Sequence, residues 1–401
     1  MSKNTSVKIK RALLSVSDKS GISELAKSLE NGGVEIVSTG GTLKHLADEG
    51  IKVKEVSDFT GSPEMMEGRV KTLHPKIHAG ILSRREKDLD EVKENFIEEI
   101  DLVVINLYPF EETVKKKVSL EETIENIDIG GPTIIRAAAK NFYYVTVLSS
   151  PENYSNFIDE FSENNEVSYE TRYELAREAF SKISEYDLAI SKYFNPTKEE
   201  GFPNLIFDKY KKISDLRYGE NPHQFAAFYE DSKTESSGIS SSNQIQGKEL
   251  SYNNIADTDA AIECVSNFSL PTCVIVKHAN PCGVASSKEN LIAYKKAFAC
   301  DPTSAFGGII AFNNELDETT ALFMKENQFI EVVAAPSFSS DALKAFSDKK
   351  NIRLLEVKNL KKSSRGIKYH SVNSGLLLQS IDIGEIAVSY THLTLPTKRI
   401  V

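Results

Sequence analysis

Tryptophan is absent from this sequence of 401 residues, and cysteine is scarce. The four cysteines, Cys264, Cys273, Cys282 and Cys300, are too few for a disulfide framework and suit a reducing compartment. No apolar run approaches the roughly 18–20 residues of a membrane helix, and segment 1–10 is too polar for a secretory signal. The sequence therefore predicts a cytoplasmic protein without a membrane span.

Positive charge is in deficit: 48 Lys and Arg stand against 58 Asp and Glu, a formal net charge of −10. This balance argues against binding of duplex nucleic acid, which requires a basic face. It leaves room for a local cationic pocket that holds one phosphorylated metabolite. A hydrophobic content of 40% supports sizeable cores, and the length predicts two or three domains.

Short apolar runs alternate with segments of helical period in the first half of the chain. We expect strands at 12–16, 34–37, 51–56 and 101–107, and helices at 22–29, 43–49, 151–163 and 170–194. Strands that alternate with helices predict an α/β fold with a parallel sheet covered on both faces. Ligands of such sheets bind at the carboxyl ends of the strands.

Two polar turns follow the first two predicted strands. Residues 15–21 and 38–42 place hydroxyls, glycines and backbone N–H groups at predicted helix N-termini, where anions bind. Ordinary N-caps would explain either turn alone, because neither matches the P-loop or dinucleotide pattern. Two such turns in successive units favour a phosphate ligand.

A basic segment, residues 68–78, could hold a phosphate or present an amine to a substrate. A solvated basic loop explains its composition equally well. His74 and His78 lie four residues apart, but no Glu stands between them as in a metalloprotease helix, so we expect no metal there.

A third group lies in residues 106–110, at the end of a buried strand, and 127–133, which open a helix. Asp128, Arg136 and Lys140 interrupt an apolar, Ala-rich stretch. Polar groups in such surroundings can have shifted pKa values and so transfer protons. A salt-bridged helix face is the alternative.

The second half of the chain has two further candidates, residues 215–224 and 272–283. The second is a predicted buried strand that delivers Lys277 and His278 at its carboxyl end, where a histidine can act as a general base and a cation can stabilise negative charge. Pro281-Cys282 is not followed by the second thiolate of a zinc deaminase, so we reject zinc.

Together and in this order, these motifs resemble the bifunctional purine-biosynthesis family of AICAR transformylase/IMP cyclohydrolase. The resemblance implies an N-terminal cyclohydrolase domain of the methylglyoxal-synthase-like, Rossmann-like fold and a cytidine-deaminase-like α/β transformylase domain without zinc, incomplete at the C-terminus. The motifs are LSVSDK (14–19), GRVKTLHP (68–75), NLYPF (106–110), DIGG (128–131), RAAAKN (136–141), LRYGENPH (216–223) and KHANP (277–281).

The resemblance also assigns roles to particular residues. The cyclohydrolase catalytic group would be Lys71, Tyr108, Asp128 and Lys140. Its nucleotide pocket would be Ser17, Asp18, Lys19, Thr39, Gly40, Gly41, Thr42, Arg69, Thr72 and Asn106. In the transformylase part, Arg217 and Tyr218 would hold AICAR, His278 would act as base, and Lys277 would stabilise the transition state.

The family implies de novo IMP biosynthesis: 10-formyltetrahydrofolate formylates AICAR, and FAICAR closes to IMP, without a metal and in a homodimer. We expect a cyclohydrolase domain at 1–195, a linker at 196–212, the first part of the transformylase at 213–388, and a tail at 389–401 that does not match the family. This tail suggests a truncated chain whose transformylase activity is impaired. A non-catalytic nucleotide-sensing module is the alternative function, since it would need the phosphate contacts but not the proton-transfer residues.

Overall fold

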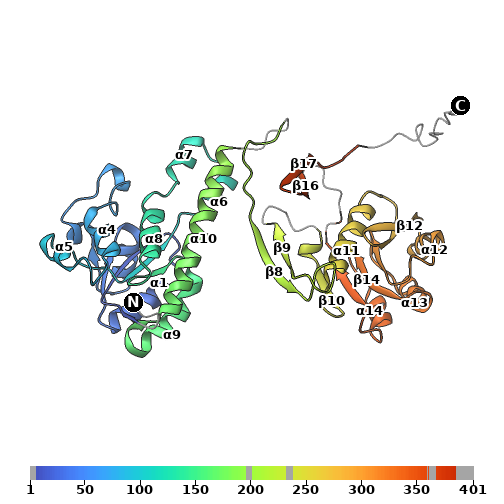
Figure 1. Cartoon of the computed structure of the whole chain (residues 1–401), viewed down its shortest axis with the longest axis horizontal. Coiled ribbons are helices and arrows are strands. Elements are labelled where there is room, and N and C mark those ends of the chain that lie inside the picture. The colour runs from blue at the N-terminus through green and yellow to red at the C-terminus, as the bar shows by residue number, and fades with distance from the viewer. Residues whose placement is uncertain (1–5, 196–200, 232–237, 359, 361–366, 385–401) are drawn as a thin grey trace. The chain divides into compact units, whose positions relative to one another are not determined.

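The computed structural model describes residues 6–195, 201–231, 238–358, 360 and 367–384 (Figure 1). The chain divides into two compact units, Met1–Phe207 (unit 1) and Asp208–Val401 (unit 2), so the division falls within the segment 196–212 that we predicted as a linker. None of the helices in these described ranges has the length and apolar character of a membrane span.

Unit 1 is built on a parallel sheet of five strands in the order β4-β3-β2-β5-β6. This confirms the predicted α/β fold. The strands are β2 (Arg11–Val16), β3 (Glu35–Ser38), β4 (Lys54–Glu55), β5 (Leu102–Asn106) and β6 (Thr146–Leu148). A short antiparallel pair, β1 (Val7–Lys8) and β7 (Glu166–Val167), completes the strands described in this unit.

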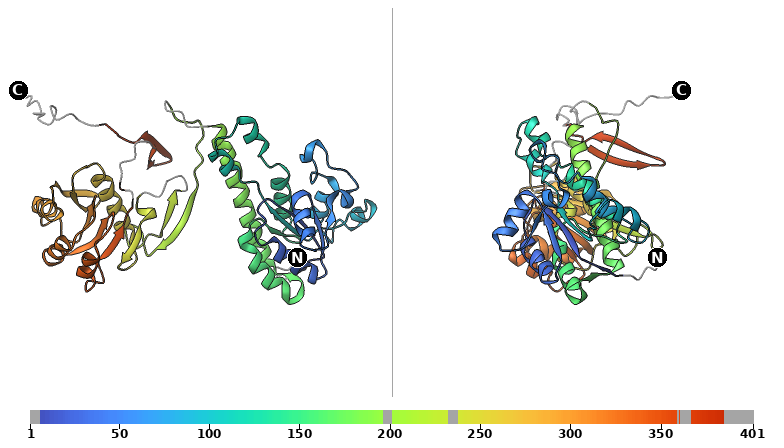
Figure 2. Two further views of the ribbon diagram at one scale, coloured as in Figure 1. Left: turned by 180° about the vertical axis from the view of Figure 1, so that it is seen from behind. Right: turned by 90° about the vertical axis from the view of Figure 1, so that its left-hand side faces the viewer.

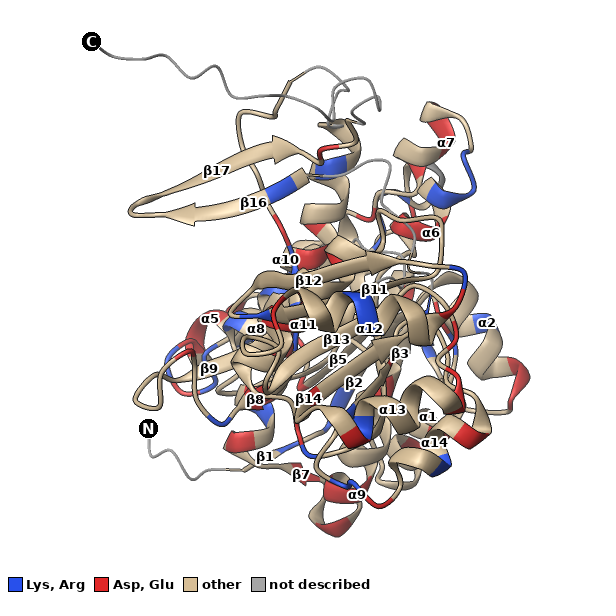
Figure 3. Ribbon diagram, turned by 90° about the vertical axis from the view of Figure 1, so that its right-hand side faces the viewer, with Lys and Arg blue, Asp and Glu red and all other residues tan. Residues whose placement is uncertain are grey.

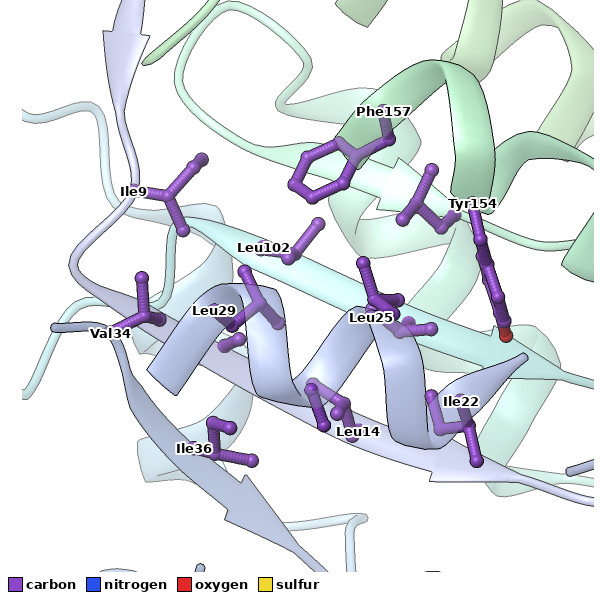
Figure 4. Packing of buried hydrophobic residues seen from close by; sticks show 14 of the residues in the cluster. Ile9, Leu14, Ile22, Leu25, Leu29, Val34, Ile36, Leu102, Tyr154 and Phe157 are labelled. Atoms are coloured by element: carbon purple, nitrogen blue, oxygen red, sulfur yellow. The ribbon is translucent and has the colours of Figure 1, made fainter. Parts of the chain in front are cut away.

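Helices cover both faces of this sheet, because consecutive strand residues point to opposite sides. Leu14 faces the core under α1 and α9, whereas its neighbour Leu13 faces the core under α4, α8 and α10. Figure 4 shows Leu25 of α1 and Phe157 of α9 in the first of these cores. The helices are α1 (Ile22–Asn31), α2 (Gly40–Asp48), α3 (Val56–Thr60), α4 (Pro75–Leu82), α5 (Leu89–Glu94), α6 (Phe110–Lys115), α7 (Leu120–Glu125), α8 (Gly130–Lys140), α9 (Tyr154–Asn164) and α10 (Tyr169–Phe194), with 3-10 turns η1 (Met66–Gly68) and η2 (Pro151–Asn153).

Element boundaries in unit 1 differ from the sequence prediction, most clearly at α2 and β4. Helix α2 begins at Gly40 rather than at residue 43, so Gly40 and Gly41 belong to its first turn and not to the loop before it. The strand predicted at 51–56 is reduced to Lys54–Glu55, where it pairs with the end of β3. The long helix α10 packs against α8, α6 and β6 (Figure 2).

Unit 2 contains a six-stranded mixed sheet in the order β10-β15-β14-β13-β11-β12. Only β13, β14 and β15 pair in parallel. The strands are β10 (Asn243–Gln246), β11 (Thr272–Lys277), β12 (Asn280–Ser286), β13 (Gly308–Phe312), β14 (Ile330–Ala335) and β15 (Arg353–Glu356). The helices are α11 (Tyr252–Val265), α12 (Asn290–Cys300), α13 (Glu318–Asn327) and α14 (Ser340–Phe346), with the 3-10 turn η3 (Ile239–Ser241).

Two hairpins flank this sheet in the sequence, β8 (Tyr210–Leu216) with β9 (Ala226–Asp231), and β16 (Ile367–Val372) with β17 (Gly375–Ser380). Helix α11 covers one face of the sheet and α12, α13 and α14 cover the other. Figure 3 shows that the central strands of both units are largely uncharged, whereas acidic and basic residues lie on helices and loops.

Candidate active site

The carboxyl ends of β2 and β5 are tied together by one side-chain amide. Oδ1 of Asn106 accepts hydrogen bonds from the backbone N–H groups of Ser17 (2.6 Å) and Asp18 (2.9 Å), and its Nδ2 donates to the carbonyl of Asp18 (2.8 Å). The amide is thus used to shape the turn after β2. Hydrogen bonds from Ser20 lower the pKa of Asp18, so this turn also carries a negative charge.

The turn after β3 is held to β2 by Thr42. Its hydroxyl accepts from the N–H of Val16 (2.9 Å) and donates to the carbonyl of the same residue (3.0 Å). Thr39, the residue before α2, makes no capping hydrogen bond with its side chain, and α1 is preceded by Gly21, which has no side chain to cap with. Side-chain capping therefore does not account for the hydroxyls in these two turns.

Two lysine ammonium groups lie at the N-terminus of α2. A methyl group placed on Gly40 would lie 3.5 Å from Nζ of Lys71, and one on Gly41 would lie 3.8 Å from Nζ of Lys19. Gly40 has a φ of +50°, a conformation that favours glycine. Free helix N–H groups with two cations beside them form a site for an anion such as phosphate.

The segment that carries Lys71 also reaches the N-terminus of α8. A methyl group on Gly130 would lie 2.9 Å from Oγ1 of Thr72, which is buried. Oδ1 of Asp128 accepts a hydrogen bond from the N–H of Gly131 (2.8 Å), so its carboxyl group sits at the start of the same helix.

Three of the four predicted cyclohydrolase residues lie close enough in this region for their charges to influence one another's pKa values. Burial raises the pKa of Asp128, against the opposing effects of backbone N–H groups and of the Lys71 ammonium. Burial also raises the pKa of Tyr108, and the charges of Asp128 and Glu64 add to this effect. Lys71 thus provides a cation in this site, beside the phenol of Tyr108 and the carboxyl group of Asp128, and the pKa values of the latter two groups are raised.

The fourth residue, Lys140, lies elsewhere in the unit. It is the last residue of α8, is exposed, and is about 15 Å along the helix from Gly130 at 1.5 Å per residue. Two neighbouring cations are engaged otherwise: Arg69 pairs with Glu125, and Arg136 lies 6.0 Å above the ring of Phe180.

His74, considered above as a metal ligand, is the residue before α4. Its Nδ1 accepts from the N–H of Lys76 (3.2 Å) and its Nε2 lies 3.2 Å from the hydroxyl of Ser62. Burial lowers the pKa of His78. The described parts of the chain contain no cluster of three or more His, Cys, Asp or Glu that could hold a metal.

In unit 2, Lys277 ends strand β11 and His278 lies in the turn to β12. His278 and Ala279 both have left-handed backbones, with φ of 52° and 56°. Asp257 of α11 accepts a hydrogen bond from the N–H of Ala279 (2.7 Å) and so holds this turn. His278 is exposed, and Nζ of Lys277 donates to the carbonyl of Gly307 (3.0 Å).

The segment with Arg217 and Tyr218 is attached to the same helix. Nδ2 of Asn253 donates to the carbonyl of Glu220 (3.4 Å), and Asn253 lies one helical turn before Asp257. The Arg217 guanidinium lies 5.8 Å from the centre of the Tyr218 ring. Both predicted groups of unit 2 are therefore anchored on one face of α11.

Sequence reasoning missed the residues that support these groups. The hydroxyl of Tyr186 in α10 accepts from the N–H of Asp128 (2.7 Å), and Glu64 contributes to the charge around Tyr108. Asn253 and Asp257 anchor the two segments of unit 2. All four lie far along the chain from the groups they support, and no local motif marks them.

Unit 1 has a parallel α/β sheet with polar turns at the carboxyl ends of its strands, and residues 21–133 match the family model of the MGS-like domain. Residues 138–400 match the model of the AICARFT/IMPCHase bienzyme, and because this is more than half of the chain, the chain belongs to that family. The match includes residues 389–400, which the sequence analysis had set apart as a tail. A protein described as "Crystal structure of ForH" is 36% identical over 46% of this chain and 98% of its own, with a TM-score of 0.41.

Family membership makes the chain an enzyme of purine biosynthesis, in a family that combines AICAR transformylase and IMP cyclohydrolase activities on the way to IMP. The transformylases of this family use a formyl-tetrahydrofolate as the one-carbon donor.

Proposed function

We propose that unit 1 closes FAICAR to IMP at the site formed by Lys71, Tyr108 and Asp128. The observation that carries this proposal is the grouping of a carboxyl group and a phenol of raised pKa beside an anion site. The 5′-phosphate binds at the N-terminus of α2 between Lys19 and Lys71, and the reacting base extends toward the N-terminus of α8.

Ring closure requires proton transfers more than it requires a metal. The carboxamide nitrogen forms a bond to the formyl carbon and gives up one proton, and the formamide nitrogen gives up another. The formyl oxygen gains these two protons and leaves as water. Asp128, whose pKa is raised by burial, is suited to accept the proton of the nitrogen. Tyr108 and Lys71 are suited to donate to the departing oxygen, and the site holds the two reacting groups of one molecule close together.

The remaining pocket residues take supporting roles in this proposal. Ser17, Thr39, Gly40, Gly41, Thr42, Thr72 and Asn106 build the turns around the phosphate. Asp18 carries a negative charge and is therefore suited to a hydroxyl of the ligand rather than to its phosphate. Arg69 lies on the adjoining segment and pairs with Glu125 in this state.

For unit 2 we propose formyl transfer from 10-formyltetrahydrofolate to the amine of AICAR. Arg217 and Tyr218 bind AICAR, His278 takes a proton from the amine, and Lys277 stabilises the developing negative charge. The common attachment of the two segments to α11 supports this assignment. We expect both reactions in the cytoplasm, without nucleic acid or membrane partners.

We further propose that Lys140 serves the cyclohydrolase site of a second copy in a homodimer. Its position at the far, exposed end of α8 supports an action across an interface. If a Lys71→Ala chain is mixed with a Lys140→Ala chain, mixed dimers regain one intact site out of two. Turnover recovered on mixing supports this proposal, whereas two variants that stay inactive on mixing refute it.

The central experiment follows ultraviolet absorbance during incubation of the protein with FAICAR. We expect turnover in the unmutated chain and its loss in Lys71→Ala and Asp128→Asn. Lys27→Ala is the matched control, because that lysine is exposed and pairs with Glu49. FAICAR binding without turnover in the unmutated chain would establish the sensing module instead. Formyl transfer is tested separately with AICAR and the folate donor, and the rate of the unmutated chain is compared with that of the His278→Ala variant.

A further inference from the structure

The buried Tyr186 holds the loop that carries Asp128. Its hydroxyl accepts a hydrogen bond from the N–H of Asp128 (2.7 Å) and donates to the carbonyl of Asn126 (3.4 Å). The loop between α7 and α8 is therefore fixed at two backbone positions by one side chain of α10. Tyr186 is 58 residues from Asp128 in the sequence.

The same helix also fixes the segment that carries Tyr108. Phe110, two residues further along, is buried and meets the rings of Tyr186 and Tyr193 edge-on, with centroid separations of 6.2 Å and 5.8 Å. Such edge-to-face pairs are a stable arrangement of aromatic rings. Helix α10 is thus the common support of two segments of the connection between β5 and β6, one on either side of α6 and α7.

We propose that Tyr186 is a positioning residue of the cyclohydrolase site, whose hydroxyl fixes the Asp128 carboxyl group relative to Tyr108 and Lys71. This inference rests on the proposed function of unit 1. Tyr186 does not exchange a proton itself, and its contact is with the backbone of Asp128 rather than with a ligand. Loss of the hydroxyl leaves the Asp128 N–H without its partner, so the loop relaxes and the carboxyl group moves.

We expect a movement of the loop to change the pKa of Asp128, because several charged and polar groups around its carboxyl group influence that pKa. The Lys71 ammonium and the N–H groups of Gly130, Gly131 and Tyr108 favour its ionised form, and burial opposes it. Glu64 faces Tyr108, and Asp187 and Asp128 face Tyr186, whose pKa burial raises to about 12. A shift of the loop changes the distances to all of these groups.

The test compares Tyr186→Phe with Tyr193→Phe in the full-length chain. Both tyrosines lie on α10 and contact Phe110, but the hydroxyl of Tyr193 has no hydrogen bond among the described residues. For Tyr186→Phe we expect kcat for FAICAR cyclisation to fall about tenfold with KM within twofold, and the acid limb of the pH profile of kcat to move. For Tyr193→Phe we expect neither change, and thermal melting of both variants checks folding.

Asp128→Asn and the double variant Asp128→Asn/Tyr186→Phe separate this inference from the proposed function. If Asp128→Asn keeps full turnover, the proposed function fails. If Asp128→Asn is impaired but Tyr186→Phe matches Tyr193→Phe in kcat and pH profile, the positioning role is wrong. Because Tyr186 acts through Asp128, the double variant should be no slower than Asp128→Asn, and a further drop would overturn the inference.

Discussion

Replacement of Gly131 by alanine tests how closely the start of α8 fits the Asp128 carboxyl group. A methyl group at this position would lie 2.5 Å from Oδ2 of Asp128 and 2.9 Å from Cδ2 of Leu107. Both separations are shorter than van der Waals contact, so the carboxyl group has to move. Its hydrogen bond from the N–H of Gly131, 2.8 Å in length, is then lost or distorted.

The size of the effect follows from that one hydrogen bond. A hydrogen bond to a charged group contributes about 1.5–3 kcal/mol, which corresponds to a fall in kcat of about 10- to 150-fold if the transition state depends on it. Alanine is favoured over glycine inside a helix by about 1 kcal/mol. The thermal midpoint should therefore not decrease in proportion to activity.

The assay is FAICAR cyclisation at several substrate concentrations, with Gly130→Ala as the comparison. A methyl group on Gly130 meets Oγ1 of Thr72 at 2.9 Å instead of Asp128, so it should raise KM more than it lowers kcat. A Gly131→Ala protein that melts normally and keeps kcat within twofold of the unmutated chain would refute the placement of Asp128 in the reaction.

Three further predictions concern stability. Because burial raises the native pKa of Asp128, the folded state binds this proton more tightly than the unfolded state, and stability falls as pH rises from the ordinary aspartate value through the raised one. Asp128→Asn should therefore melt higher than the unmutated chain at pH 7, with the difference vanishing in acid; an equal difference at all pH values would contradict this. Arg172 is buried and donates to the carbonyls of Phe142, Val167 and Tyr143. In urea unfolding, Arg172→Met should lower the free energy of unfolding by about 3 kcal/mol or more, whereas the control Arg177→Met, at an exposed position, should lower it by at most about 0.5 kcal/mol. Gly283→Ala, whose methyl group would overlap the carbonyl oxygen of Ala297, should destabilise unit 2 by about 1–3 kcal/mol without loss of cyclohydrolase turnover, and an unchanged unfolding curve would show that α12 can move away.

The fold of unit 1 was predictable because its pattern is local. The apolar stripe Ile22, Leu25, Ala26 and Leu29 marks α1, and these residues are the buried face of the helix. The start of α2 was missed because Gly40 and Gly41 are typical of turns, although here glycine inside the first helical turn makes room for lysine side chains. Helix propensity describes the preference of the backbone and takes no account of the side chains that pack against it.

The hairpin around His278 could not be predicted in the same way. Two-residue hairpin turns with left-handed backbones favour Asn-Gly and similar pairs, whereas this turn is His-Ala. The hydrogen bond from Ala279 to Asp257 offsets part of the strain, and Asp257 comes from a helix about 20 residues earlier. The sequence predicts a strand that ends at Lys277 and His278, but the reversal of the chain after them depends on a tertiary contact.

The separation of Asp128 and Lys140, in contrast, follows from the sequence and helix geometry alone. The segment between them has helical character and is α8 in the structure, so the two residues lie at opposite ends of about three turns. A lysine side chain is shorter than this helix, so one copy of the chain does not bring both groups to the same reacting atoms without unwinding α8. A proton transfer by Lys140 at the atoms that Asp128 serves therefore requires the Lys140 of a second copy. Mixing the Lys71→Ala and Lys140→Ala chains tests this requirement, because only a site shared by two copies can be restored by two inactive partners.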